Sequence, residues 1–136
     1  MNEILNINSI KDCSTYLAGA ARNTFKVGIC TTTAFIGTEL ANNLYELHVI
    51  PYIYKNAQLY AQENAFLGTQ WMAGHMAGQA AVVAARSTFE PASRMLGCGL
   101  GLLAGIIIAN TALLTADITV NAITRISKNC FPQAES

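Results

Sequence analysis

The side chains of this sequence that can transfer protons are few and stand far apart. Glu39 and Glu46 fall on one face of a predicted helix, but seven residues of helix separate them by about 10 Å, too far to share a proton. His48 comes shortly before Pro51, where the negative end of a helix dipole favours a histidine. The sequence shows no nucleophile beside a base, no close acid–base pair and no metal-ligand set. We therefore expect a protein that is not an enzyme.

Two other ionisable residues lie in or beside apolar stretches and are the polar candidates for a functional site. His75 stands in the small-residue run AGHMAG. It would either carry protons within a membrane or form a hydrogen bond with Gln70 or Gln79, and we expect the hydrogen bond. Asp117 follows a long apolar stretch. It would either mark the boundary of that stretch or be buried with a partner, and we expect the boundary.

The remaining chemical signals point away from bound ligands. The glycines of the run GCGLG at 97–101 occur without a preceding strand or a Gly-Lys-Ser/Thr ending, so they do not predict a phosphate loop. Eight basic and eight acidic residues give a net charge of zero, which offers no electrostatic support for nucleic-acid binding. We expect no cofactor, no metal and no small-molecule substrate. The cysteines lack the spacing of a metal site: Cys13, Cys30, Cys98 and Cys130.

The element that dominates the chain is the uncharged stretch of residues 95–116, MLGCGLGLLAGIIIANTALLTA. About 20 apolar residues suffice for a helix to cross the hydrocarbon core of a bilayer. Gly97, Gly101 and Gly105 recur every four residues, which places them on one helical face where a second backbone can approach. We predict that these glycines are helix-packing residues.

A second stretch of small and apolar residues covers 64–85 and contains Gly74 and Gly78, also predicted to pack against a helix. The segment RSTFEPASR at 86–94 separates the two stretches and contains Pro91. Proline suits the first turn of a helix, and a short charged connection is typical of antiparallel neighbours. The sequence therefore predicts a hydrophobic helical hairpin of 64–85 and 95–116.

The whole chain is predicted to be all-α with about four helices. We expect them at about residues 9–26, 27–50, 52–85 and 91–128, with the second ended or kinked by Pro51. The predicted organisation is an amphipathic helical region at 1–63, the hydrophobic hairpin with an amphipathic extension at 64–128, and a tail at 129–136.

The composition leaves two hypotheses about function. Hydrophobic residues make up 52% of the chain and charged residues 12%, about half the charged fraction of a typical soluble domain. The first hypothesis is a membrane-associated, non-enzymatic anchor, scaffold or assembly subunit that contacts the lipid bilayer and self-associates or binds a protein partner through small-residue helix packing. The alternative is a cytoplasmic α-helical bundle, or a subunit of a larger helical assembly, with the hairpin buried in its core.

Overall fold

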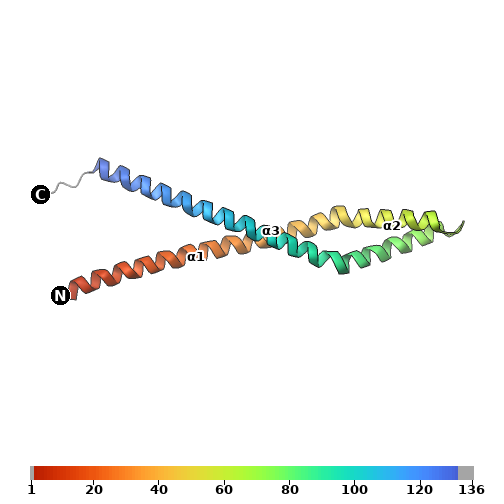
Figure 1. The fold of residues 1–136 in the computed structure, drawn as a ribbon, viewed down its shortest axis with the longest axis horizontal. Helices are drawn as coiled ribbons and strands as arrows, with labels where there is room; N and C mark the ends of the chain where they lie inside the picture. The colour runs from red at the N-terminus through yellow and green to blue at the C-terminus, as the bar shows by residue number, and fades with distance from the viewer. Residues whose placement is uncertain (1, 132–136) are drawn as a thin grey trace. The chain divides into compact units, whose positions relative to one another are not determined.

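The computed structural model describes residues 2–131, and the side chains of residues 9–131. The order of elements is α1 (Asn2–Leu44), a π-helical turn η1 (Tyr45–Val49), α2 (Ile50–Asn64) and α3 (Gln70–Cys130) (Figure 1). Within the described residues there is no strand, so the all-α prediction is confirmed. The predicted number of helices is wrong, because α1, η1 and α2 form one continuous helical stretch and α3 forms a second.

Pro51 is predicted to end or kink a helix, and in the structure the helix continues through it. The π-helical turn directly before Pro51 adds one residue to the turn, and the Ile50 N–H bonds the carbonyl of Tyr45, five residues earlier. Pro51 then occupies the first turn of α2, directly after the widened turn. The wider turn accommodates the proline without interrupting the helix.

The predicted hairpin between 64–85 and 95–116 is wrong, because residues 70–85 of the first stretch and all of the second belong to one helix, α3. The segment 86–94, expected to be a connection, is helical, and Pro91 lies inside the helix. Its charged side chains have partners at helical spacing or on the facing helix, such as Arg94 with Glu90. These partners favour a helical conformation where the composition alone is typical of a turn.

The chain reverses direction at residues 65–69 instead. Gly68 has a φ of 97°, in the left-handed region that a residue with a Cβ rarely adopts. The Thr69 backbone N–H and its hydroxyl both donate to the Phe66 carbonyl, at 3.0 and 2.9 Å. The turn therefore places α2 antiparallel to the first part of α3 (Figure 1).

The chain divides into two compact units. The central unit is Thr33–Leu102, and the terminal unit combines Met1–Thr32 with Leu103–Ser136. One boundary between the units falls inside α1 and the other inside α3. The regions predicted at 1–63, 64–128 and 129–136 stay predictions, and residues 132–136 of the expected tail lie outside the described residues.

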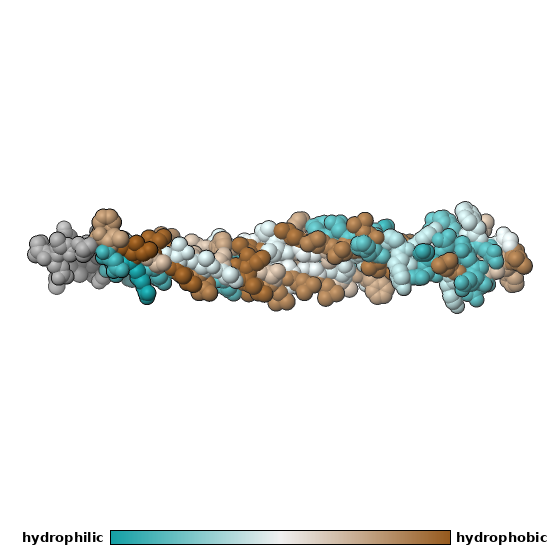
Figure 2. All heavy atoms as spheres, turned by 90° about the horizontal axis from the view of Figure 1, so that it is seen from above, coloured by the Kyte–Doolittle hydropathy of each residue, from teal (hydrophilic) through white to brown (hydrophobic). Residues whose placement is uncertain are grey.

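Little apolar surface is buried among the described residues. The buried apolar residues are Tyr45, Ile50, Ala85 and Ala109, and the first three form a small cluster with Ile53 and Val82 packed against it. Figure 2 shows apolar side chains over much of the visible surface. Within the described part, α3 is the one helix whose length and apolar composition suffice to cross a membrane.

Candidate functional site

In the central unit, α1 and α3 approach so closely that their backbones touch at three glycines. A Cβ built on Gly97 would overlap the Gly37 carbonyl oxygen and lie 2.5 Å from the Cβ of Ala41. A Cβ on Gly101 would overlap the Thr33 carbonyl oxygen and lie 2.8 Å from the Cα of Ala34. Only a hydrogen atom fits at these positions. We call the contact of Gly37, Gly97 and Gly101 the glycine crossing.

The other predicted glycines have different surroundings. A Cβ on Gly74 would lie 2.7 Å from Cγ of Gln62, and one on Gly78 would lie 2.6 Å from Cε2 of Tyr54. Both glycines are buried and face side chains of α2, not its backbone. Gly105 is buried in the terminal unit. Gly97 and Gly101 therefore pack against α1, whereas Gly74 and Gly78 pack against α2.

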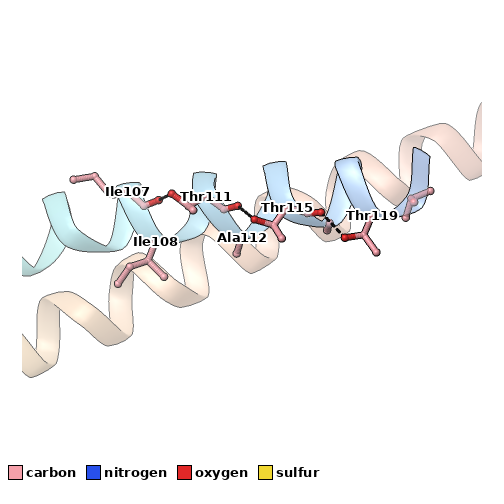
Figure 3. Close-up of a pocket in the computed structure, with 8 residues that line it drawn as sticks. Ile107, Ile108, Thr111, Ala112, Thr115 and Thr119 are labelled. Atoms are coloured by element: carbon pink, nitrogen blue, oxygen red, sulfur yellow. Dashed lines mark hydrogen bonds between the residues drawn. The ribbon is translucent and has the colours of Figure 1, made fainter. Parts of the chain in front are cut away.

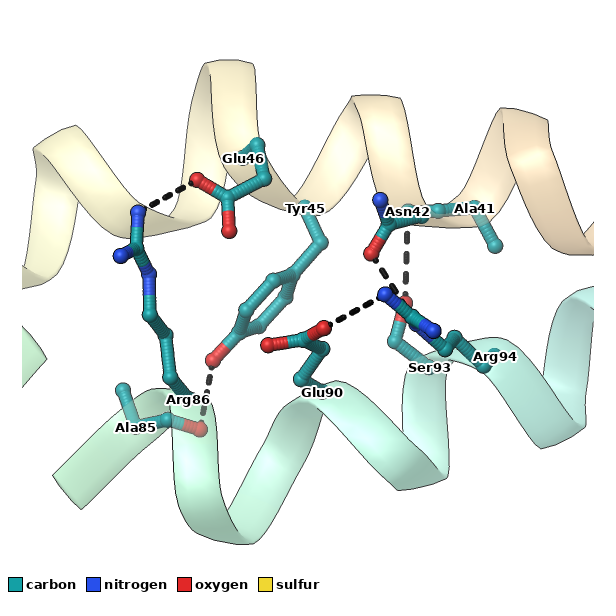
Figure 4. A network of polar contacts seen from close by, with 9 residues as sticks. All are labelled: Ala41, Asn42, Tyr45, Glu46, Ala85, Arg86, Glu90, Ser93 and Arg94. Carbon is teal, nitrogen blue, oxygen red and sulfur yellow. Dashed lines mark hydrogen bonds and ion pairs between the residues drawn. The ribbon is translucent and has the colours of Figure 1, made fainter. Parts of the chain in front are cut away.

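A group of polar contacts holds α1 and η1 to α3 beside the glycine crossing (Figure 4). The Tyr45 hydroxyl donates to the Ala85 carbonyl at 2.8 Å, and the Arg86 guanidinium lies 2.9 Å from a carboxylate oxygen of Glu46. Arg94 pairs with Glu90 at 2.7 Å and also donates to the side-chain oxygen of Asn42 at 3.3 Å.

The acidity of the buried Tyr45 hydroxyl is altered by its surroundings. Burial raises the pKa of Tyr45 above 10.0, and the negative charges of Glu90 and Glu46 raise it further, whereas Arg86 opposes them. The phenol is therefore kept protonated, which its hydrogen bond to the Ala85 carbonyl requires. Because the composition of 86–94 predicts a connection, the sequence does not predict this network. The spacing of Arg86, Glu90 and Arg94 at every fourth residue is the helical signal that could have revealed it.

His75 is exposed and lies in a small aromatic and polar cluster of the central unit. Its Nδ1 lies 2.9 Å from the Tyr54 hydroxyl and its Nε2 lies 3.0 Å from the side-chain nitrogen of Gln79. The ring stacks on Trp71, with centroids 5.7 Å apart. With Gln79 donating to Nε2, the ring proton lies on Nδ1 and is donated to Tyr54. Both ring nitrogens are occupied by hydrogen bonds.

Asp117 forms an ion pair with Arg22 in the terminal unit. The pair joins α3 to α1 near the end of the apolar stretch that Asp117 follows. Both side chains are about half exposed, so the carboxylate is not buried in an apolar environment. His75 belongs to the central unit and Asp117 to the terminal unit.

No match to a known protein was found. Neither a family model, nor a curated protein, nor a solved structure is significantly similar to this chain. The geometry of the chain itself therefore carries the functional argument.

An open groove of about 790 Å³ runs along α3 in the terminal unit (Figure 3). Its polar lining atoms are threonine hydroxyls, and each donates to the carbonyl four residues earlier, as Thr111 does to Ile107 at 2.8 Å. Within the described part of the chain no three metal-ligating side chains gather. The groove thus has an apolar surface without a free polar group to orient a ligand. Its lining residues are Ile107, Ile108, Thr111, Ala112, Thr115, Ala116, Thr119 and Val120.

Proposed function

We propose that this chain is a membrane-associated, non-enzymatic helical scaffold. Its α3 residues 95–116 contact lipid, and its small residues hold helices together. The observation that carries the proposal is the exposure of large apolar side chains in this stretch. Leu96, Leu100 and Leu103 are each at least 60% exposed, and Ile107 and Leu114 are similar. A surface of this kind favours lipid over water as its environment.

The hydrogen bonding of the threonines supports a lipid environment. Thr111 and Thr115 donate to carbonyls one turn earlier in α3, and Thr31 and Thr32 do the same in α1. In hydrocarbon, polar groups must be satisfied within the protein because no water is present. These hydroxyls therefore meet lipid at little cost.

Charged residues border the proposed membrane segment and have partners. Arg94 precedes it and pairs with Glu90, and Asp117 follows it and pairs with Arg22. Between them α3 has no charged side chain over 22 residues. A charge at the centre of the bilayer would cost about 2.5–3.5 kcal/mol on insertion scales, so this arrangement favours 95–116 as the segment in lipid.

A second candidate is a cytoplasmic subunit of a larger helical assembly. The charged network of Arg86, Glu90 and Glu46 favours it, because these residues interrupt the apolar character of the helices that pack together. In that function the exposed apolar side chains would be covered by protein, not by lipid.

Membrane fractionation followed by carbonate and detergent extraction tests the proposal. We expect the protein to stay in the membrane pellet in carbonate and to enter the supernatant only with detergent. Recovery as a detergent-free oligomer would support the second candidate, and recovery as a detergent-free monomer would contradict both.

A matched pair of substitutions locates the membrane segment. Ile107→Asp places a charge inside 95–116 at a side chain that is 66% exposed, and we expect it to abolish carbonate-resistant retention. Ile126→Asp changes a similarly exposed isoleucine outside the segment, and we expect retention to be unchanged. Equal behaviour of the two variants would exclude 95–116 as the segment in lipid.

A further inference from the structure

The stretch of α3 that we place in lipid is joined to α1 at both of its borders. In the central unit Arg94, directly before the stretch, donates to the side-chain oxygen of Asn42 at 3.3 Å (Figure 4). In the terminal unit Asp117, directly after the stretch, pairs with Arg22. Residues 23–41 of α1 therefore lie between two contacts to the borders of the α3 stretch.

In the central unit the two helices run antiparallel and leave no room for lipid between their backbones. Gly97 meets Gly37. Four residues further along α3, Gly101 meets Thr33, which precedes Gly37 by four residues in α1. A Cβ at either α3 glycine would overlap a carbonyl oxygen of α1. The environment that surrounds the first turns of 95–116 therefore also surrounds the α1 residues that touch them.

Residues 27–38 of α1 carry no charge and present an uncharged face away from α3. Val27 and Phe35 are 65% and 67% exposed, comparable to 66% for Ile107 in the α3 stretch assigned to lipid. Pairs of exposed and half-buried positions alternate along the run. The two threonine hydroxyls of the exposed face donate to carbonyls one turn earlier, so neither needs water as a partner. The exposed face consists of Val27, Gly28, Thr31, Thr32, Phe35 and Ile36.

Charged residues flank this run near the two borders. Glu39 lies two residues beyond Gly37, which meets Gly97 near the start of the α3 stretch. Lys26 lies one helical turn, about 6 Å, from Arg22, which pairs with α3 at the other border. The long stem of a lysine lets its ammonium group reach the membrane interface from such a position. Both charges therefore stay outside the hydrocarbon.

We infer that residues 27–38 of α1 form a second lipid-contacting surface, so that the chain enters the bilayer as an antiparallel pair of helices. The inference rests on the proposed function and adds α1 to it. Twelve residues of helix span about 18 Å, less than the hydrocarbon core of about 30 Å, so this run alone predicts no membrane segment. Its backbone contact with α3 carries the inference. As a consequence, both ends of the chain lie on one side of the membrane, and the turn at 65–69 lies on the other.

Two native cysteines test this topology. Cys13 and Cys130 are exposed, and each lies 14 residues outside a proposed lipid segment. Three full-length variants each keep a single thiol: Cys13, Cys130, or Leu67→Cys in the turn, with the other cysteines replaced by alanine. A membrane-impermeant maleimide is added to sealed membrane vesicles of one orientation, before and after detergent. We expect Cys13 and Cys130 to react from the same side, and Leu67→Cys to differ from them at least tenfold before detergent.

The competing topology has α3 alone crossing the membrane. Cys13 would then react from the same side as Leu67→Cys, and Cys130 from the opposite side. That result would overturn the inference and leave the proposed function intact. Reaction of all three thiols from one side would also overturn the inference, and carbonate extraction of the same variants then tests the proposed function separately.

A matched pair of tryptophan substitutions locates the lipid contact on α1. Trp71→Phe removes the single native tryptophan. Phe35→Trp then reports on 27–38, and Tyr52→Trp reports on a similarly exposed aromatic position of α2. In phosphatidylcholine vesicles with dibrominated acyl chains, we expect Phe35→Trp to be quenched at least twofold more than Tyr52→Trp. Equal quenching of the two would overturn the inference.

A tryptophan in α3 separates the inference from the proposed function. Ile107→Trp lies in the stretch assigned to lipid and should be quenched to a similar extent as Phe35→Trp. Quenching of Ile107→Trp without quenching of Phe35→Trp would overturn the inference alone. Quenching of neither would contradict the proposed function as well.

Discussion

Two glycine pairs of α3 have the same four-residue spacing and make different kinds of contact. Gly97 and Gly101 face the backbone of α1, at Gly37, Thr33 and Ala34. Gly74 and Gly78 face the side chains of Gln62 and Tyr54 on α2. The spacing alone therefore predicts a packing face but not its partner, because a backbone and a flexible side chain can fill the same space.

The difference sets how each pair tolerates an added methyl group. A backbone held in a helix cannot move away locally without shifting the whole helix. A side chain can change its rotamer to make room, at a cost of about 0.5–1.5 kcal/mol when it leaves a preferred angle. We expect the glycine crossing to be the more sensitive contact.

The largest effect is predicted for Gly101→Ala. The new Cβ would overlap the Thr33 carbonyl oxygen, so the helices must separate, and we expect the free energy of unfolding to fall by about 3 kcal/mol. Denaturant titration in detergent micelles, followed by circular dichroism, measures it. Gly99→Ala is the matched control, because nothing lies within 4 Å of its Cβ. It should instead stabilise the helix by about 0.5–1 kcal/mol, and a loss equal to that of Gly101→Ala would contradict the glycine crossing.

A smaller loss, about 1 kcal/mol, is predicted for Gly78→Ala. Its Cβ would meet the edge of the Tyr54 ring, which can rotate away. Gly28→Ala, with open space around its Cβ, serves as the control. Tyr54→Leu sharpens the comparison. Combined with Gly78→Ala, it should restore most of the lost free energy of unfolding. Shortening a neighbouring side chain should not restore the stability of Gly101→Ala, because its Cβ meets backbone. If such a second substitution did restore it, the two glycine pairs would not differ.

Tyr45→Phe removes the hydrogen bond to the Ala85 carbonyl and keeps the ring. We expect the free energy of unfolding to decrease by about 0.5–1.5 kcal/mol. Tyr52→Phe, at an exposed tyrosine of α2, should have no measurable effect. An equal response of both variants would show that the buried hydroxyl contributes nothing specific.

The raised pKa of Tyr45 also predicts a dependence on pH. Because the folded protein binds this proton more tightly than the unfolded chain, the contribution is constant below pH 10.0 and is lost as pH rises through the folded-state pKa. Unfolding midpoints measured from pH 8 upward should fall more steeply above pH 10.0 for the natural protein than for Tyr45→Phe. Parallel curves of unfolding midpoint against pH for the two proteins would refute the assignment of this pH dependence to the Tyr45 hydroxyl.

The smallest effect is expected for Glu46→Gln. Its partner Arg86 is about half exposed, and solvent-screened pairs of this kind contribute about 0.2–1 kcal/mol. The loss in the free energy of unfolding should be smaller in 1 M salt, where the ion pair of the natural protein is screened. Glu63→Gln on α2, for which the structure gives no ion pair, is the comparison. A loss above that of Tyr45→Phe would mean that the charges, not the buried hydroxyl, hold this part of the central unit.

The sequence alone was sufficient for the helical class and for the apolar stretch at 95–116. These depend on composition and on the near absence of strand signals, both of which act locally along the chain. The small-residue spacing predicts Gly97 and Gly101 as packing positions but does not predict the segment they contact. Local patterns, however, predict a turn at 86–94, because Pro91 and clustered charges are typical of a connection. That prediction is wrong, since the segment is helical.

Only the tertiary structure decided where the chain reverses and what each packing face meets. The turn at 65–69 depends on Gly68 adopting a positive φ, which the two helices it joins then maintain. Helix 86–94 depends on Glu46 and Asn42, which bind Arg86 and Arg94 from 40 and 52 residues earlier in the chain. Such partners are invisible to a local pattern, because their contribution exists only once distant segments lie side by side.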